Sequence, residues 1–339
     1  MTGIRWLTLL AAIFFIAGCG GEGPKTAVEG RDKPGKLREV GVSLNRQVGP
    51  EHAGLLMAEA NGYFADVGLK VSLTSPASPM WPVRYLLSKL VDSEFAVSHE
   101  PQVAISIENG HPITAVGSLI SEPTAALIWL KGSGIESVSD LKGKTIAIPG
   151  LPFQRGLLES LLARSGVKLE DVKLRYVGYE AVPTLVSGRA DAIFGGSPQL
   201  EGVELRSLGR KPVITPLHGT GIPPYDELVL ITTTDLASRE PQLARDFLAA
   251  LARGTAAAVR NPQAVVRGIE NDAEPSPVSS RKARESQVAA ILPLLSRDNY
   301  MDPEQAEDLI DWMHGEGMIR KRIPVSELLT NEFLPQPEG

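Results

Sequence analysis

Apolar and polar positions alternate with two different periods through the first two thirds of the chain. Short apolar runs typical of buried strands alternate with stretches in which apolar residues return every three or four positions, as on one face of a helix. The predicted strands are 37–44, 70–74, 95–98, 113–117, 145–148, 174–177, 192–194 and 228–232. The clearest intervening helices are predicted within 53–64, 85–90 and 157–162. This alternation predicts an α/β fold with parallel sheets and helices on both faces.

Beyond residue 232 the pattern becomes helical only. Apolar faces with helical spacing recur around residues 243–259, 288–295 and 306–313. The last of these helices has a clear start, because Asp302 is a good N-cap and Pro303 suits the first helical position. Residues 271–280 are polar and rich in proline, so a loop is predicted there. The C-terminal third is therefore expected to form a helical layer packed on a body already built.

The N-terminus has the pattern of an export signal. Arg5 precedes an apolar run over residues 6–16, and two small residues then lead to Cys19. The run is shorter than the roughly 20 apolar residues that a spanning helix needs, so a signal peptide is predicted over 1–18. Residues 16–19, IAGC, resemble a bacterial lipobox, in which the cysteine is acylated. The alternative is an ordinary secretory signal with an incidental cysteine.

Residues 19–36 are rich in Gly, Pro, Lys and Glu, which predicts a flexible tether. We therefore expect a protein anchored to the cell membrane by lipidated Cys19, with its body on the extracytoplasmic side.

Composition narrows the function of the rest of the chain. The 339 residues carry a net charge of −6 and no basic stripe, which argues against a nucleic-acid partner. Cys19 is the single cysteine, so a disulfide framework or a cysteine-based metal site within one chain is excluded. Common hydrolase, metalloprotease and phosphate-loop motifs do not occur. The expectation is a monomer without metal or cofactor and without enzymatic activity.

Four segments carry a family resemblance. Residues 59–69 read EANGYFADVGL, residues 138–146 read VSDLKGKTI, and residues 188–196 read GRADAIFGG. More specific is Glu201 followed by residues 221–229, which read GIPPYDELV. In this order they resemble the periplasmic solute-binding proteins of the nitrate, sulfonate and thiamine-precursor type, and above all the subgroup that binds formylaminopyrimidine. The resemblance covers residues 37–295.

The resemblance implies a type II periplasmic-binding-protein fold, with two lobes, parallel-rich sheets and two crossover strands. Lobe I would comprise residues 37–125 and 228–339, and lobe II residues 126–227. The chain would cross from lobe I to lobe II near residues 124–129 and return near residues 225–230. A small molecule would bind in the cleft, the lobes would close by hinge motion, and the closed form would deliver it to the permease of an ABC importer.

Several candidate ligand-binding residues follow the predicted strands of lobe II. Gly195 and Gly196 come directly after a buried strand, where bare backbone N–H groups can approach a ligand. Glu201 matches the family glutamate that pairs with a pyrimidine ring nitrogen and amino group, and a carboxylate can accept two adjacent hydrogen bonds. Phe153 stands in a strand-to-helix turn whose amides could hold a polar group. A plain turn and a solvated glutamate are the alternatives.

Four further candidates come from other parts of the chain. Tyr225 and Glu227 lie at the second predicted crossing, where hinge packing is the alternative. His99, in the loop after the strand 95–98, is preferred over His52 as the cleft histidine. Trp81, between prolines in a predicted loop, could supply an aromatic wall.

The chain departs from the family where aromatic residues usually stack on the ligand. Arg46 lies in the segment where the family has a tryptophan, and residues 197–199 read SPQ instead of an aromatic pair. Arg46 could pair with an anionic group. The best prediction of function is thus binding of a thiamine-precursor-like pyrimidine or related heterocycle. The alternatives are an anionic solute such as a sulfonate or nitrate, a pyrimidine synthase of the same fold, and a structural envelope lipoprotein.

Overall fold

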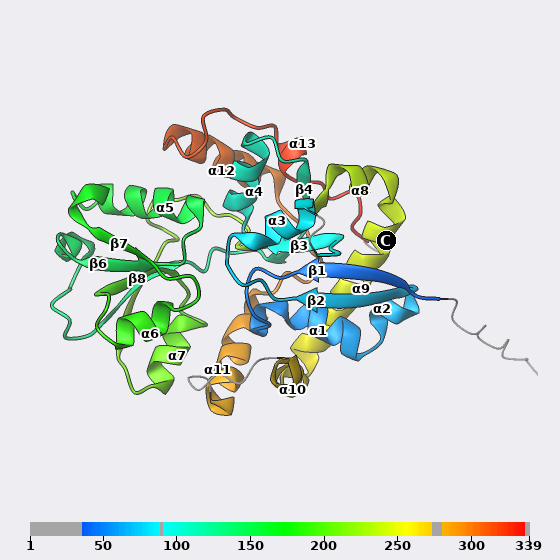
Figure 1. The fold of residues 1–339 in the computed structure, drawn as a ribbon, viewed down its shortest axis with the longest axis horizontal. Helices are drawn as coiled ribbons and strands as arrows, with labels where there is room; N and C mark the ends of the chain where they lie inside the picture. Colours follow the sequence, from blue (N-terminus) through cyan, green and yellow to red (C-terminus); the bar gives the residue numbers. More distant parts are fainter. Residues whose placement is uncertain (1–35, 89–90, 273–279, 336–339) are drawn as a thin grey trace, which may run out of the picture. The chain divides into compact units, whose positions relative to one another are not determined.

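The computed structural model describes residues 36–88, 91–272 and 280–335. The predicted signal peptide, Cys19 and nearly all of the predicted tether lie outside these residues, as does most of the predicted loop 271–280. The described residues form two five-stranded sheets flanked by helices, which is the predicted α/β architecture (Figure 1). Among them, no helix is long and apolar enough to cross a membrane.

The first sheet has the strand order β2-β1-β3-β10-β4. Its strands are β1 (Arg38–Ser43), β2 (Leu69–Thr74), β3 (Phe95–Ser98), β4 (Ile113–Ile120) and β10 (Leu228–Thr233). β1 runs parallel to both β2 and β3, with Val40 opposite Val71 and Val42 opposite Phe95. β10 is antiparallel to β3 and β4. Every residue of β3 and β4 is buried, because helices cover both faces of the sheet.

The second sheet repeats this arrangement in the order β7-β6-β8-β5-β9. Its strands are β5 (Ala126–Leu130), β6 (Thr145–Ile148), β7 (Lys173–Tyr176), β8 (Ala192–Gly196) and β9 (Pro212–Pro216). β6 runs parallel to β7 and β8, and β5 is antiparallel to β8 and β9. The chain passes from the first sheet to the second between β4 and β5 and returns between β9 and β10.

Three local predictions need correction. β9 was not predicted, because prolines at both of its ends suggest a loop, yet proline is tolerated in an edge strand. Trp81 is the first residue of helix α3 (Trp81–Ser88) rather than a loop residue. Gly195 and Gly196 are the last two residues of β8 rather than the first two after it.

The remaining helices follow the strands. They are α1 (Ala53–Ala60), α2 (Tyr63–Asp66), α4 (Glu100–Glu108), α5 (Pro152–Ala163), α6 (Ala181–Val186), α7 (Glu201–Ser207), α8 (Thr234–Arg239), α9 (Pro241–Arg260), α10 (Pro262–Asp272), α11 (Arg281–Ile291), α12 (Pro303–Gly315) and α13 (Val325–Leu328). The long helix α9 packs on α1 and on the first sheet. Its Phe247 lies 4.4 Å from Phe95 and 4.9 Å from Phe64 between ring centroids.

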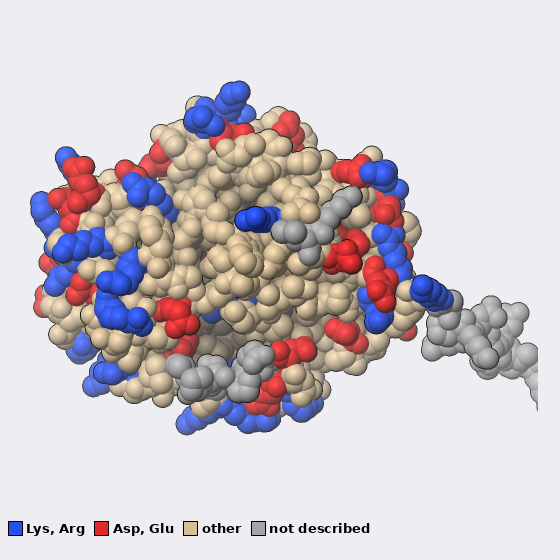
Figure 2. All heavy atoms as spheres, in the orientation of Figure 1, with Lys and Arg blue, Asp and Glu red and all other residues tan. Residues whose placement is uncertain are grey.

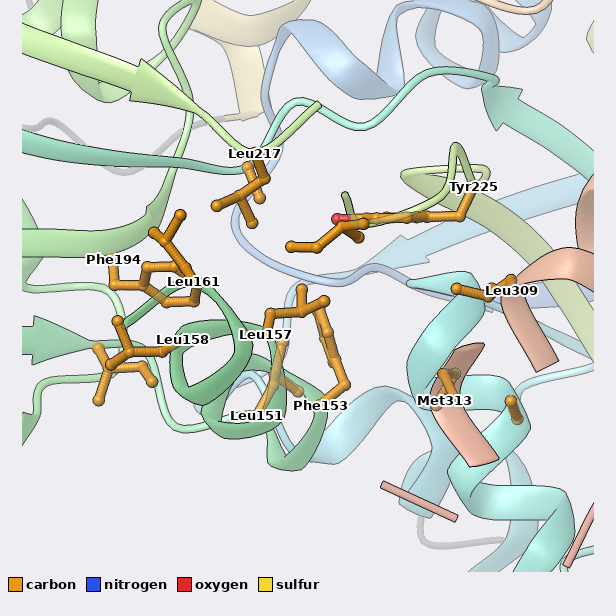
Figure 3. Packing of buried hydrophobic residues seen from close by; sticks show 14 of the residues in the cluster. Leu151, Phe153, Leu157, Leu158, Leu161, Phe194, Leu217, Tyr225, Leu309 and Met313 are labelled. Atoms are coloured by element: carbon orange, nitrogen blue, oxygen red, sulfur yellow. The ribbon is translucent and has the colours of Figure 1, made fainter. Parts of the chain in front are cut away.

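The C-terminal helices also contact the elements around the second sheet. α11 packs against α7, and Gln287 Nε2 donates to the carbonyl of Leu200 at 3.1 Å. Beyond α12, Met318 packs against Gly156 of α5. An apolar core continues from α4 through α5 to α12, where Phe153, Tyr225 and Met313 point into the same region (Figure 3). One side of the space between the sheets is thus filled with apolar side chains.

Charged residues of both signs occur on the face of the molecule shown in Figure 2. On the face shown in Figure 2, lysines and arginines alternate with aspartates and glutamates around the rim, and the centre consists mostly of uncharged residues. The described part of this face therefore carries no basic stripe of the kind that nucleic-acid binding needs.

Candidate ligand-binding site between the two sheets

A cavity of about 80 Å³ lies where loops from the two sheets meet. From the first sheet it is lined by Asn45 and Arg46 after β1 and by His99 after β3. From the second it is lined by residues that follow β6 and β7, by the end of β8, and by Glu201 at the start of α7. These are carboxyl ends of parallel strands, the edge at which α/β sheets bind ligands.

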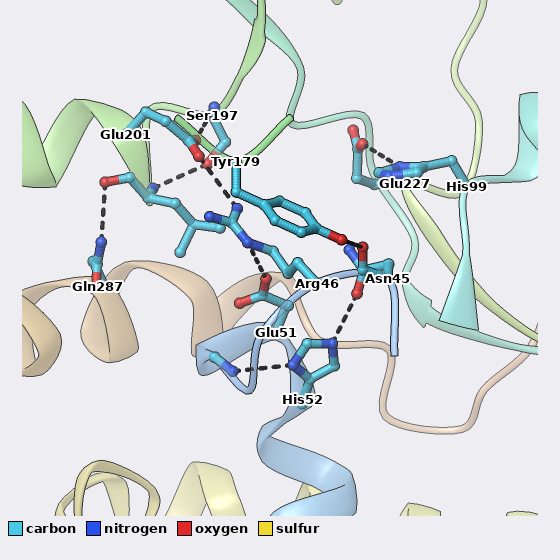
Figure 4. Close-up of polar contacts among 12 residues, drawn as sticks. Asn45, Arg46, Glu51, His52, His99, Tyr179, Ser197, Glu201, Glu227 and Gln287 are labelled. Atoms are coloured by element: carbon cyan, nitrogen blue, oxygen red, sulfur yellow. Dashed lines mark hydrogen bonds and ion pairs between the residues drawn. The ribbon is translucent and has the colours of Figure 1, made fainter. Parts of the chain in front are cut away.

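Arg46 links the two sides of this cavity through two carboxylates (Figure 4). Its Nη1 lies 3.2 Å from Glu201 Oε1, and its Nε lies 3.7 Å from Glu51 Oε1. Glu201 also accepts a hydrogen bond from the backbone N–H of Ser197 at 2.7 Å. Burial alone would lower the pKa of Arg46, but the charges of Glu201 and Glu51 outweigh it and raise that pKa. The guanidinium therefore stays charged between the two carboxylates.

A neutral hydrogen-bonded chain lies beside the ion pair. His52 Nδ1 accepts from the N–H of Gly49 at 3.1 Å, so the ring proton is on Nε2, which donates to Asn45 Oδ1 at 2.8 Å. The hydroxyl of Tyr179, from the loop after β7, donates to the backbone carbonyl of Asn45 at 3.0 Å. Burial lowers the pKa of His52, which keeps the imidazole neutral. This chain orients the loop after β1 towards the second sheet.

His99 is held on the opposite side of the cavity, near the chain crossings. Its Nδ1 lies 3.0 Å from Glu227 Oε1, and its ring lies 5.2 Å from that of Phe153 between centroids. Glu227 Oε2 accepts from the backbone N–H groups of Thr124 and Ala125 at 2.6 and 3.1 Å. Burial alone would raise the pKa of Glu227, but these hydrogen bonds and His99 lower it overall. The carboxylate of Glu227 thus connects His99, which lines the cavity, to the backbone at both chain crossings.

The glycines of β8 allow a second polar side chain to reach the cavity. Gly195 has φ +81°, a backbone conformation that other residues rarely adopt. A Cβ atom at this position would lie 2.7 Å from Nε2 of Gln154, which is buried in the first turn of α5. The missing side chain therefore makes room for the amide of Gln154. A Cβ at Gly196 would lie 3.3 Å from Cγ of Glu201, so this glycine lets the glutamate pack on the strand.

The structure brings five of the nine predicted residues into the cavity lining, namely Arg46, His99, Gly195, Gly196 and Glu201. Phe153 and Glu227 lie behind His99 and support it. Tyr225 is fully buried in the apolar core, and its hydroxyl has no hydrogen-bond partner among the described residues. Trp81 packs edge-on against Tyr85 and is not among the lining residues, although its neighbours Met80 and Pro82 line an adjoining cavity of about 30 Å³. Roles in binding stay predictions for all nine.

Sequence reasoning missed Asn45, Gln154 and Tyr179. Asn45 and Tyr179 follow β1 and β7, so their place after parallel strands was a signal that could have found them. Tyr179 supplies an aromatic ring to the cavity wall. Gln154 could not be found in this way, because only the absence of a side chain at Gly195 brings its amide to the cavity.

The described residues do not bring three His, Cys, Asp or Glu side chains together as a metal site would require.

The chain is similar to curated proteins whose names refer to thiamine biosynthesis or to pyrimidines. A Haemophilus influenzae protein named for thiamine biosynthesis is 29% identical over 294 residues, which are 85% of this chain and 90% of that protein. The formylaminopyrimidine-binding protein of Halalkalibacterium halodurans is 27% identical over 98% of this chain and 99% of its own length. The 4-amino-5-hydroxymethyl-2-methylpyrimidine phosphate synthase of Legionella pneumophila is 25% identical over 87% of this chain and 92% of its own length.

Comparison with solved structures supports the fold. The alkanesulfonate-binding protein SsuA of Xanthomonas axonopodis pv. citri, solved with MOPS, matches with a TM-score of 0.69 over 87% of this chain and 99% of that chain, at 14% identity. The described residues therefore adopt the periplasmic-binding-protein fold. The family described as NMT1/THI5 like matches residues 49–265, well over half of the sequence, and the chain belongs to this family.

Proposed function

We propose that this protein is an extracytoplasmic solute-binding protein that captures a small molecule between its two sheets and delivers it to an ABC importer. The observation that carries the proposal is the cavity lined from both sheets by residues at strand ends. Because two chain crossings join the sheets, a molecule in this position would favour their closed arrangement. The curated binding protein that aligns over nearly the whole chain supports the same class.

The charges around the cavity favour a neutral or weakly basic solute over an anion. Arg46 is the cation of the lining, and it is already shared between Glu201 and Glu51. A further carboxylate, Glu204, has a pKa raised to about 7, first by burial and then by the charge of Glu201. A sulfonate entering this site would meet more negative than positive charge. The proposed solute is therefore a heterocycle with N–H donors, such as a thiamine-precursor pyrimidine, with Glu201 accepting from it and Tyr179 beside its ring.

A thermal-shift titration tests this proposal. The purified protein is mixed with 4-amino-5-hydroxymethyl-2-methylpyrimidine and, separately, with taurine and MOPS as sulfonate probes. At 100 times the dissociation constant a ligand adds about 2.7 kcal/mol, which predicts a rise in melting temperature of at least about 3 °C. We expect the rise with the pyrimidine alone. Glu201→Ala should abolish it, whereas Glu170→Ala, at an exposed glutamate outside the cavity, should retain it.

The outcomes separate the candidate classes. A rise in melting temperature with the sulfonates alone would show that the solute is an anion, which is the alternative to the pyrimidine. Formation of the pyrimidine phosphate by the purified protein, followed by mass spectrometry, would favour the enzyme alternative suggested by the synthase relatives. No shift with any probe would contradict the transport proposal.

The lipid anchor at Cys19 belongs to the same proposal, because a tethered binding protein stays beside its permease. Cells given labelled palmitate should incorporate the label into the wild-type protein and not into Cys19→Ser. The substituted protein should then be recovered from the soluble extracytoplasmic fraction. An unlabelled wild type would rule out lipidation.

A further inference from the structure

Arg46 stands between two carboxylates that belong to different sides of the cavity. Glu51 lies in the turn before α1, beside the first sheet, and Glu201 begins α7, beside the second. One guanidinium contacts both, through Nε at 3.7 Å and Nη1 at 3.2 Å (Figure 4). The contact with Glu201 is therefore a charged link across the cavity.

The two carboxylates depend on Arg46 to different degrees. Glu51 is only 3% exposed, and its Oε2 has no hydrogen-bond partner among the described residues. A Cβ atom at Gly49 would lie 2.5 Å from that oxygen, so the carboxylate is packed directly on the backbone of the loop. A buried carboxylate with a free oxygen strongly requires a cation beside it.

Glu201 has support besides Arg46, because the backbone N–H of Ser197 donates to it at 2.7 Å. Of the two carboxylates, Glu201 is therefore the one that can be separated from Arg46 without losing all of its partners, although Arg46 itself is closer to Glu201 than to Glu51. The unpartnered oxygen of Glu51 is available to accept the guanidinium N–H that this separation sets free.

We propose that Arg46 is a specificity-determining residue that acts by competition: it closes the empty cavity by pairing with Glu201, and it yields that carboxylate to a solute by moving fully onto Glu51. A solute that offers N–H donors can replace the guanidinium at Glu201. An anion cannot replace the guanidinium, because it has no positive charge or N–H donor to offer Glu201 and would be repelled by it. This selection of solutes rests on the proposed function, whereas the closing of the empty cavity does not.

The other polar contacts between the two sides do not compete with a solute in this way. Tyr179 donates to the carbonyl of Asn45, and Gln287 donates to the carbonyl of Leu200, so neither uses the carboxylate of Glu201. Both contacts are also uncharged. Of these three contacts between described residues, the Arg46–Glu201 pair is the charged one and therefore the one that added salt weakens.

The first test needs no solute. The variant Arg46→Met/Glu51→Gln removes the guanidinium and the buried carboxylate together, so Glu51 is not left as a buried unpaired charge and the net charge is unchanged. Glu201 loses its cation but keeps the hydrogen bond from the backbone N–H of Ser197. Small-angle X-ray scattering of the empty protein should show a larger radius of gyration for this variant than for the wild type. Raising NaCl from 50 to 500 mM should enlarge the wild type alone. Lys70→Met, in an exposed ion pair outside the cavity, is the control and should scatter like the wild type. An unchanged radius in the double variant would overturn the proposed closure.

The second test measures affinity by calorimetry, with 4-amino-5-hydroxymethyl-2-methylpyrimidine as the probe. Without the competing ion pair, the double variant should bind the probe about fivefold more tightly than the wild type. Added salt should tighten binding to the wild type and leave the variant unaffected. Weaker binding by the variant would mean that Arg46 itself donates to the solute, which would overturn competition. If neither protein binds the probe while the variant opens, the proposed pyrimidine function fails and the closure by Arg46 stands.

Discussion

Glu100 and Asp226 are buried carboxylic acids beside the second chain crossing. Each is only 2% exposed, and Glu100 Oε2 accepts the backbone N–H of Asp226 at 2.7 Å. Burial, with the nearby charge of Asp226, raises the pKa of Glu100 to about 8, and burial raises the pKa of Asp226 to about 6. Glu100 therefore stays protonated in the folded protein at neutral pH, whereas in the unfolded chain it ionises near pH 4.5.

This difference predicts a pH dependence of stability. Because the folded state holds the proton more strongly, Glu100 makes the free energy of unfolding fall as pH rises from about 4.5 to about 8. Glu100→Gln keeps an acceptor for the N–H of Asp226 and removes the titration. The free energy of unfolding of this variant, measured with urea and taken relative to that of the wild type, should rise by at least about 1 kcal/mol from pH 5 to pH 8. The control Glu170→Gln, at an exposed site, should show the same change of unfolding free energy with pH as the wild type. If the free energies of unfolding of Glu100→Gln and of the wild type changed equally with pH, Glu100 would not be protonated in the folded protein.

Gly195 and Gly188 offer a matched pair of substitutions. Both have positive φ, at +81° and +72°, but a Cβ at Gly195 would meet Gln154 at 2.7 Å and a Cβ at Gly188 would meet nothing within 4 Å. Gly188→Ala should cost about 1 kcal/mol through the backbone alone. Gly195→Ala should cost more and should also weaken solute binding, because it pushes Gln154 from the cavity wall. Urea unfolding and calorimetry measure the two effects. Equal losses of stability with unchanged affinity would show that Gln154 moves aside freely.

At the scale of elements, helices α1 and α9 cross so closely that a glycine of α9 touches the backbone of α1. A Cβ at Gly254 would lie 2.1 Å from the carbonyl oxygen of Gly54 and 2.7 Å from the backbone nitrogen of Ala58. Backbone atoms of a packed helix cannot turn aside as a flexible side chain can. The apolar periodicity predicts that both helices exist, but it does not show which residues meet at the crossing.

The substitution Gly254→Ala should therefore destabilise the protein by about 2 kcal/mol or more, despite the better helix propensity of alanine. Gly315→Ala, at the end of α12, is the control because a Cβ there meets nothing within 4 Å. It should stay within about 1 kcal/mol of the wild type. Chemical unfolding measures both, and a Gly254→Ala protein as stable as the wild type would refute the close crossing.

At the scale of the whole described body, the C-terminal helices decide how the two sheets are held together. α11 reaches α7 on one side, and Met318 beyond α12 reaches α5 on another. The tail was predicted to pack on the first lobe, and the structure adds these contacts with helices of the second sheet. Opening of the cavity must therefore involve the tail as well as the crossings.

A double-mutant cycle tests the contact of the tail with α5. A Cβ at Gly156 would lie 2.6 Å from Cγ of Met318, so Gly156→Ala has to displace that side chain in the wild type. In a Met318→Ala background the space is free, and the helix propensity of alanine should stabilise the protein by about 1 kcal/mol. The effect of Gly156→Ala should thus be more favourable in that background by about 1 kcal/mol, measured by urea unfolding. Additive effects would mean that the tail does not press on α5.

Much of the fold could be predicted because the signals are local. Most strands and helices show their own period, so the alternation of elements and the helical tail were visible in the sequence. The antiparallel direction of β5 and β10 was not visible, since it depends on where the chain crosses between the sheets. The edge strand β9 was concealed by its prolines.

The sequence by itself determined the family, the α/β class and the strand ends near which Gly195 and His99 lie. Only the tertiary structure decided which groups meet there. The sequence singled out Arg46 because it could pair with an anionic group, and the structure brings it against Glu51 and Glu201, which lie 5 and 155 residues away in the chain. The physical reason is that periodicity records the environment of one segment, whereas an ion pair or a cavity depends on groups that converge from distant segments.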